Sequence, residues 1–140
     1  MTTKLDKLLY TAHTHTTGGR DGSGRSSDGA LDVKLSPPGS GKPGTNPEQL
    51  LGVGWSACFI GAMGLAAKSL GLKMPQDAAV EANVSLGMTD AGAYGLAATL
   101  SITLPGLTAG QKQQLVDTAH DTCPYSKALK GNIEITLLIA

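Results

Sequence analysis

Two cysteines are the residues of this sequence best suited to redox chemistry. Cys58 stands in the middle of a long apolar segment with helical character, where a thiol by itself has a raised pKa and is unreactive. Cys123 is followed directly by Pro124, so it lies at a predicted helix break and can move as a resolving thiol must. From the residues alone, each cysteine fits either a small buried core residue or a redox-active thiol.

Metal and nucleotide sites are weakly supported by the sequence. Two cysteines without a CxxC pair and three scattered histidines fall short of the ligand set of a structural zinc site. The segment Gly39-x-Gly41-x-x-Gly44 has the spacing of a dinucleotide loop, but Pro43 stiffens it and the sequence lacks the alternating strands and helices of that fold. We therefore expect no bound cofactor and no metal.

Composition narrows the partners and the compartment. The 140 residues fit a single domain, 1–140, and the 11 basic and 11 acidic residues cancel. With 4% aromatic residues and no basic stripe, there is little with which to hold phosphates or stack bases, so we expect no nucleic acid partner. The first ten residues lack the apolar run of a signal peptide, which predicts a reducing, cytoplasmic location where cysteines stay free or redox-active.

The long apolar segment is predicted to be a helix over residues 45–71. Asn46 can cap this helix, Pro47 suits its first position, and Gln49 can complete a capping box. No charged residue occurs from 50 to 67, a pattern typical of a core helix or a membrane span. We favour a core helix and expect no membrane span, because basic flanks are lacking and several glycines interrupt the run: Gly52, Gly54, Gly61 and Gly64. Such glycines indicate close packing against another element of this chain or of a partner.

Alternating and capped segments predict the remaining elements. Alternation of apolar and polar residues predicts strands over 8–17, 31–35, 80–88, 96–104 and 133–139. The turn at 89–93 joins the third and fourth of these into an antiparallel hairpin with one solvent-exposed face. A capping box from Thr108 to Gln111 opens a polar helix, and a short helix follows Pro124 and ends at Gly131. Helices segregated from antiparallel sheet indicate an α+β fold.

Four short segments carry a resemblance to a known family. They are Gly19–Gly22, Asn46–Leu50, Ala57–Phe59 and Cys123–Ser126. In order and spacing they resemble the organic hydroperoxide resistance (Ohr) branch of the Ohr/OsmC superfamily, over essentially the whole chain. One departure is Trp55-Ser56, where the family more often has Tyr-Ala. The resemblance implies an Ohr/OsmC-like α+β fold, with antiparallel sheets around a buried central helix, in an intertwined homodimer.

The resemblance also implies a function in the oxidative stress response. Members of this branch are thiol-dependent peroxidases that reduce organic hydroperoxides, alkyl or fatty-acid, to alcohols. By this resemblance Cys58 is the peroxidatic cysteine, Cys123 the resolving cysteine, and Arg20 with Glu48 the polar pair of the active site. Cys58 becomes a sulfenic acid, Cys123 condenses with it to a disulfide, and the dihydrolipoyl group of a lipoylated protein restores both thiols.

The roles of the polar pair agree with physical chemistry. A guanidinium near sulfur favours the thiolate and can stabilise the alkoxide leaving group, which suits Arg20. Glu48 can accept hydrogen bonds from that guanidinium and fix its orientation. On one straight helix, however, the ten residues from Glu48 to Cys58 span about 15 Å, too far for one constellation. Either the helix bends near its glycines or the pair comes from a second chain; we predict that Arg20 and Glu48 act on Cys58 of the other subunit.

Alternative functions stay open at this point. One is an OsmC-like peroxidase with a different substrate preference, and another is a redox sensor or lipid-binding module whose thiols record oxidation without turnover. The Arg20 and Glu48 pair favours turnover, since a sensor needs only one accessible thiol of low pKa. The apolar neighbours of the thiol would suit a fatty or aromatic peroxide, although they can equally be core residues: Phe59, Ile60, Met63 and Leu65.

Overall fold

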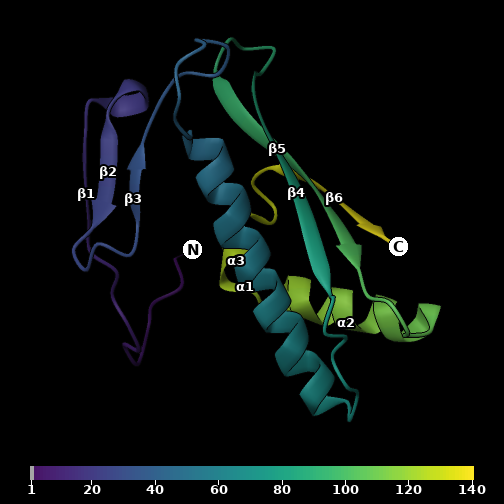
Figure 1. Ribbon diagram of the computed structural model, residues 1–140. Coiled ribbons are helices and arrows are strands. Elements are labelled where there is room, and N and C mark those ends of the chain that lie inside the picture. The colour runs from purple at the N-terminus through teal and green to yellow at the C-terminus, as the bar shows by residue number, and fades with distance from the viewer. Residues whose placement is uncertain (1) are drawn as a thin grey trace. The chain divides into compact units, whose positions relative to one another are not determined.

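The computed structural model describes residues 2–140 of the chain. They fall into two compact units, the first ending at Pro47 and the second running from Glu48 to Ala140 (Figure 1). Each unit has its own sheet of three strands. The expectation of a single domain over 1–140 stays a prediction, and the two units are described in turn.

The first unit is a small antiparallel sheet in the order β1-β2-β3. Its strands are β1 (Thr14–Thr17), β2 (Ser23–Ser26) and β3 (Asp32–Lys34), with the 3-10 helix η1 (Gly19–Asp21) between the first two. The prediction of a strand from residue 8 is wrong before Thr14. Because β2 pairs with β1 over only four residues, the earlier alternating residues have no partner strand, and Leu9 is 84% exposed.

The long helix α1 (Pro47–Ser69) starts at the boundary of the two units and belongs to the second from Glu48 onward. Its first residue confirms the predicted start at Pro47. Only one face of α1 is buried, and the largest side chains on it are Trp55, Phe59 and Met63, all fully buried. The opposite face is apolar as well, yet Val53 and Leu65 are each 73% exposed. The sequence predicts a buried helix, but within one chain only one of its two faces is covered.

By length and composition α1 is also apolar enough to cross a membrane. In its most apolar stretch of 18 residues, 39% of the residues are buried inside the fold. The covered face of the helix packs into the core of the second unit.

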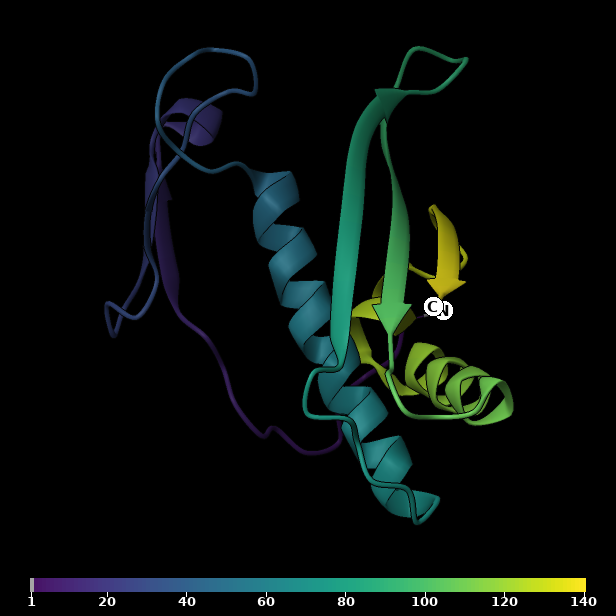
Figure 2. The same ribbon diagram turned by 45° about the vertical axis from the view of Figure 1, so that its right-hand side comes forward.

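The second sheet has the order β4-β5-β6, formed by β4 (Ala79–Met88), β5 (Tyr94–Thr103) and β6 (Glu134–Ile139). As predicted, β4 and β5 form an antiparallel hairpin. The expectation of purely antiparallel sheets fails at β6, which pairs with β5 in parallel. The physical reason is the crossover of α2 (Ala109–Thr122) and α3 (Pro124–Leu129), which returns the chain to the same end of the sheet (Figures 1 and 2).

The core of the second unit lies between one face of this sheet and the helices. Alternate residues of β5 are buried on that face, among them Leu100 and Ile102, while their neighbours Thr99 and Ser101 are partly exposed on the other. Helix α2 adds Leu115, Val116 and Ala119, and α1 supplies its covered face. The same cluster contains Cys123 and is contacted by Cys58, so the core positions both thiols.

Candidate active site

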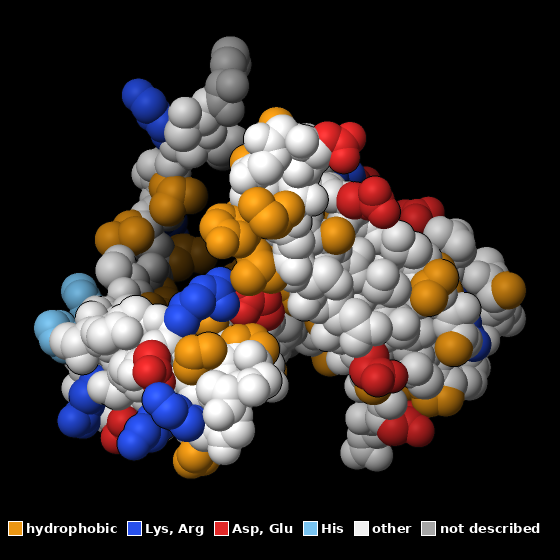
Figure 3. All heavy atoms as spheres, turned by 90° about the horizontal axis from the view of Figure 1, so that it is seen from above, with side chains coloured by type: hydrophobic (Ala, Val, Ile, Leu, Met, Phe, Trp, Pro, Cys, Tyr) orange, Lys and Arg blue, Asp and Glu red, His pale blue; other side chains and the backbone are white. Residues whose placement is uncertain are grey.

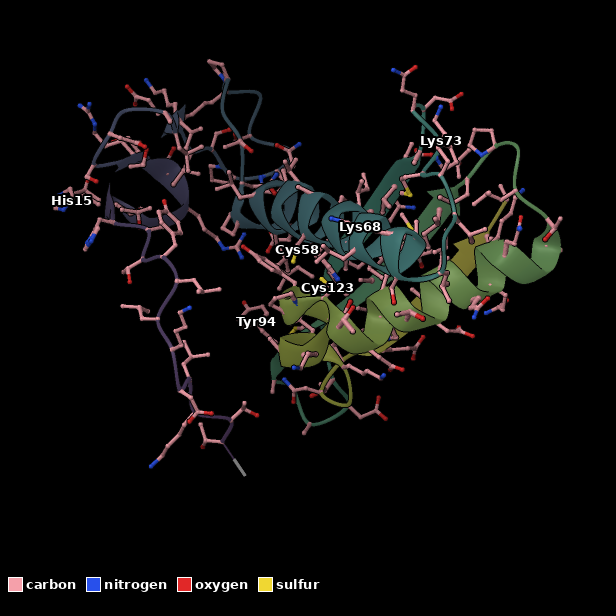
Figure 4. The ribbon with its side chains drawn as sticks, turned by 90° about the horizontal axis from the view of Figure 1, so that it is seen from below. His15, Cys58, Lys68, Lys73, Tyr94 and Cys123 are labelled. Atoms are coloured by element: carbon pink, nitrogen blue, oxygen red, sulfur yellow. The ribbon has the colours of Figure 1, made fainter. Side chains whose placement is uncertain are left out.

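The two cysteines lie side by side in the second unit. The Sγ atoms of Cys58 and Cys123 are 3.2 Å apart, and both residues are free thiols. Cys58 is partly buried on α1, whereas Cys123 is fully buried where α2 meets α3 (Figure 4). A disulfide needs an S–S distance of about 2.05 Å, so a shift of about an ångström would join them. The pair can therefore store and release two electrons.

Cys123 holds its position because it terminates two helices. Its backbone N–H donates to the carbonyl of Ala119 and closes α2, and its own carbonyl accepts from the N–H of Lys127 in the first turn of α3. Pro124 occupies the first position of α3, where the backbone N–H that proline lacks would have no partner within the helix. The predicted helix break is confirmed, and the extended backbone of Cys123 turns its side chain into the core.

The surroundings of Cys58 oppose its ionisation. Burial raises the pKa of the Cys58 thiol, and the S–H···S hydrogen bond with Cys123 adds to the increase. The backbone N–H of Tyr125 acts in the opposite direction, because its hydrogen bond to sulfur favours the thiolate. The net direction is upward, so a reactive thiolate at Cys58 needs a further stabilising charge.

Arg20 and Glu48 belong to different units. Arg20 lies in η1, the short 3-10 helix that follows β1. Gly22 makes this turn possible, because a Cβ there would lie 1.8 Å from the carbonyl oxygen of Thr17. Glu48 lies in the first turn of α1, where a carboxylate is favoured by the helix dipole.

The spacing of Glu48 and Cys58 bears on how they can cooperate. Helix α1 is unbroken from Pro47 to Ser69, so ten residues separate the two along its axis, or about 15 Å. Of the four predicted site residues, the structure therefore brings together Cys58 and Cys123, and it places Glu48 about three turns from Cys58 in the same chain.

Comparison with known proteins places this chain in a family. The family model described as OsmC-like protein matches residues 39–138. The organic hydroperoxide resistance protein of Xanthomonas axonopodis pv. citri is 48% identical over 139 residues, covering 96% of this chain and 97% of the relative. OhrA of Bacillus subtilis is 41% identical over 142 residues, with 97% and 99% covered. The chain belongs to the Ohr branch of the OsmC-like family. Its resemblance in four short segments is thereby confirmed.

Solved structures support the same assignment for the fold. The crystal structure of OhrB of Bacillus subtilis matches with a TM-score of 0.89 at 38% identity, covering 95% of this chain and 100% of that one. An organic hydroperoxide resistance protein from Elizabethkingia anophelis matches with a TM-score of 0.86 at 39% identity, with 96% and 98% covered. The predicted Ohr/OsmC-like α+β fold is confirmed.

Two residues next to the thiols in this Ohr chain are not predicted from the sequence. The indole Nε1–H of Trp55 donates to the Oγ of Ser126 over 3.0 Å, and both side chains are fully buried. The available signal was their spacing, since Trp55 stands three residues before Cys58 and Ser126 three residues after Cys123.

The apolar neighbours of Cys58 divide between core and surface. Phe59 and Met63 are fully buried in the hydrophobic core of this Ohr chain. Ile60 packs partly against that core, and Leu65 is 73% exposed on the opposite face of α1. The reading of these residues as core, which the sequence leaves open, is correct for Phe59 and Met63.

His120 lies one turn before Cys123 on α2, and its ring meets that of Phe59 with centroids 6.4 Å apart. Burial lowers the pKa of His120, and the charge of Lys130 lowers it further against the opposite effects of Asp121 and Asp117. In the part of the chain that the structure describes, its Nδ1 atom is buried without a hydrogen-bond partner. The C-terminal turn of a helix favours a protonated histidine, but burial of His120 lowers its pKa and so favours the neutral ring.

Replacement of His120 by glutamine should flatten the dependence of stability on pH below about 6.5. Because the pKa of His120 is lowered in the folded chain from an ordinary value of 6.5, only the unfolded chain takes up its proton just below that pH. The contribution of neutral His120 to the free energy of unfolding is therefore fully present above pH 6.5 and is lost as the pH falls below that value. The free energy of unfolding is measured by urea titration over a series of pH values. In His120→Gln its slope against pH should decrease by the equivalent of at most one bound proton. His15→Gln, on exposed β1, is the control; an unchanged slope in His120→Gln would contradict the assignment.

Proposed function

We propose that this chain is a thiol peroxidase that reduces organic hydroperoxides to alcohols and so supports resistance to them. The observation that carries the proposal is the 3.2 Å contact between the Sγ atoms of Cys58 and Cys123. It occurs in a chain 48% identical to an organic hydroperoxide resistance protein. Two free thiols in contact suit a cycle that ends in a disulfide. A redox-inert core cysteine would not need a second thiol beside it.

The proposed reaction starts with the thiolate of Cys58 attacking the terminal peroxide oxygen. An S–O bond forms, the O–O bond breaks, and the alkoxide takes up a proton and leaves as the alcohol, so Cys58 becomes a sulfenic acid. The thiolate of Cys123 then attacks the sulfur of Cys58; the S–S bond forms, the S–O bond breaks and water leaves. An external dithiol exchanges with this disulfide, becomes a disulfide itself and returns both cysteines to thiols.

We propose a dihydrolipoyl group on a lipoylated protein as the external dithiol, as the family resemblance implies. The exposed Lys127 lies in α3, on the segment that follows Cys123. A reducing, cytoplasmic compartment fits this cycle, because the thiols must return to the reduced state after every turnover.

Arg20 is our candidate for the charge that Cys58 lacks. The thiol of Cys58 has a raised pKa, and a guanidinium within hydrogen-bonding reach would offset this and bind the developing alkoxide. Glu48 would hold the guanidinium through its planar fork. Since Glu48 and Cys58 of one chain are about three turns apart on α1, we propose that Arg20 and Glu48 serve the Cys58 of a partner subunit.

The uncovered face of α1 supports a homodimer. Exposed apolar or small residues recur on it every fourth position: Val53, Ala57, Gly61 and Leu65. A Cβ added at Gly61 would meet no atom within 4 Å, so the backbone there is open to close approach. Figure 3 shows that hydrophobic side chains are also open to solvent on the face seen from above. Such uncovered apolar surface is typical of protein interfaces.

A steady-state assay tests the proposed activity directly. The reduced chain is mixed with tert-butyl hydroperoxide and excess dihydrolipoamide, and alcohol formation and dithiol consumption are followed together. We expect many equivalents of alcohol per chain, with one dithiol consumed for each peroxide. Oxidation of a single equivalent followed by no turnover would contradict the peroxidase and favour the redox sensor.

Mixing two inactive variants should restore activity if the site is shared between subunits. In a mixed dimer of Arg20→Met and Cys58→Ser chains, one Cys58 would face the intact Arg20 of its partner. After subunit exchange, about half of the dimers are mixed and each has one complete site, so about a quarter of the wild-type activity should return. The peroxidase assay measures this recovery. Its absence, with mixed dimers demonstrated by native mass spectrometry, would place the whole site within one subunit.

A further inference from the structure

A buried hydrogen bond joins α1 to α3 close to the two thiols. The indole Nε1–H of Trp55 donates to the Oγ of Ser126 over 3.0 Å, and both side chains are fully buried. A buried indole N–H needs such a partner, because leaving it unpaired costs the full desolvation of the group. The bond therefore joins α3 to α1 at a buried point.

The bond is placed one helical turn from the contact between the sulfurs. Trp55 stands three residues before Cys58 on α1, and residues three apart on a helix are neighbours. Ser126 stands three residues after Cys123, the residue that caps α3. Two side-chain contacts thus join the same two segments: the hydrogen bond from Trp55 to Ser126 and the contact between the two sulfurs. The two cysteines of the second contact are labelled in Figure 4.

Tyr125 provides a third link between these segments. Its backbone N–H is hydrogen-bonded to the sulfur of Cys58. Its ring lies over Gly54 of α1, so closely that a Cβ at Gly54 would be 3.2 Å from the Tyr125 hydroxyl oxygen. A side chain at Gly54 would therefore require the Tyr125 ring to shift by a few tenths of an ångström.

Helix α3 depends on such links for its position. It has six residues and no side-chain cap at its N-terminus. A helix this short is not stable alone, so tertiary contacts must hold it. Cys123 immediately precedes α3, and its carbonyl accepts from the N–H of Lys127 in that helix, so the position of Cys123 is tied to that of α3.

We propose that Trp55 and Ser126 are positioning residues that hold the Cys123 thiol against Cys58 for disulfide formation. The inference rests on the proposed peroxidase cycle and concerns its second step, in which Cys123 displaces water from the Cys58 sulfenic acid. That step competes with a second peroxide, which would oxidise the sulfenic acid to sulfinic acid. A clamp that keeps the sulfurs in contact favours the disulfide, as any fixed near-attack geometry does.

Two variants test the clamp from its two ends. Ser126→Ala removes the acceptor, and Trp55→Phe removes the donor while keeping an aromatic ring. Thr122→Ala is the matched control: it removes a hydroxyl one residue before Cys123 whose hydrogen bond goes to Thr118 within α2. Circular dichroism verifies folding, and if Trp55→Phe does not fold, Ser126→Ala decides.

The first readout is over-oxidation of Cys58, measured by mass spectrometry over a series of peroxide concentrations. We expect both variants to reach half-maximal sulfinic acid at about tenfold lower peroxide than wild type, with the initial rate of peroxide consumption within about twofold. Thr122→Ala should behave as wild type. Equal over-oxidation in all four proteins would overturn the proposal.

The second readout does not depend on peroxidase activity. The equilibrium between dithiol and disulfide is measured in dithiothreitol redox buffers, by alkylation and mass spectrometry. We expect the disulfide to be about five- to tenfold less favoured in both clamp variants than in wild type and in Thr122→Ala. If wild type shows no peroxide turnover but this shift is found, the proposed function fails and the positioning role stands. If turnover is found without this shift or the over-oxidation, the positioning role is wrong.

Discussion

Substitution of Cys58 by serine should abolish peroxide reduction, lowering kcat/KM by on the order of 10⁴-fold or more. The hydroxyl of serine is not ionised at neutral pH and cannot form the sulfenic acid, so both steps of the cycle are lost. The loss is of the size found when the nucleophile of an enzyme is removed. The measurement is alcohol formation from tert-butyl hydroperoxide with dihydrolipoamide in excess.

Cys123→Ser provides the comparison for this variant. Its Cys58 is intact, so we expect one rapid equivalent of alcohol, followed by sulfinic acid at Cys58 and loss of turnover. Removal of the Cys123 thiol, the other partner of the 3.2 Å contact, thus leaves peroxide reduction by Cys58 intact and stops disulfide formation. Full activity in Cys58→Ser, or a burst in Cys58→Ser and none in Cys123→Ser, would refute the assigned roles.

Arg20→Met should have the second largest effect, lowering kcat/KM by about 10²- to 10³-fold. Within its own unit Cys58 has a raised pKa, and the loss of the proposed guanidinium would leave both the thiolate and the leaving alkoxide without a counter-charge. The pKa of Cys58 should rise further, because an adjacent cation stabilises the thiolate. The rate of iodoacetamide alkylation against pH measures this shift independently of peroxide turnover.

The chain offers a matched control for this arginine. Arg25 lies on β2 of the same unit and is exposed, and Arg25→Met removes an equal charge. It should leave both the peroxidase rate and the alkylation profile near those of wild type, because salt screens an exposed charge that has no specific contact with the thiol. Equal effects of the two substitutions would mean that net charge, and not Arg20 itself, governs the thiol.

Features that depend on neighbouring residues could be predicted from the sequence. The capping box of α2 forms as predicted, with Thr108 Oγ1 accepting from the N–H of Gln111 and the Gln111 side chain accepting from the N–H of Thr108. Pro47 begins α1 as predicted. These signals work because a cap satisfies donors within one helical turn, so its partners are close in the sequence. Alternation predicts the β4–β5 hairpin for the same reason.

Local pattern fails where pairing partners decide the outcome. The alternating residues before Thr14 form no strand because no neighbouring strand extends far enough to pair with them. The last strand, β6, is predicted correctly as an element, but its parallel pairing follows from the path of α2 and α3 over the sheet. Strand direction is a property of that path and leaves no mark in the residues of β6.

By itself the sequence determined the helix that carries Cys58, the helix break at Cys123 and, through four short segments, the family. Only the tertiary structure decided that these thiols meet at 3.2 Å and that Trp55 binds Ser126 beside them. Local rules determine the conformation of each segment, since their partners are a few residues away. The meeting of α1 and α3 depends instead on how a shared core packs, and that packing sums contacts between residues distant in the chain.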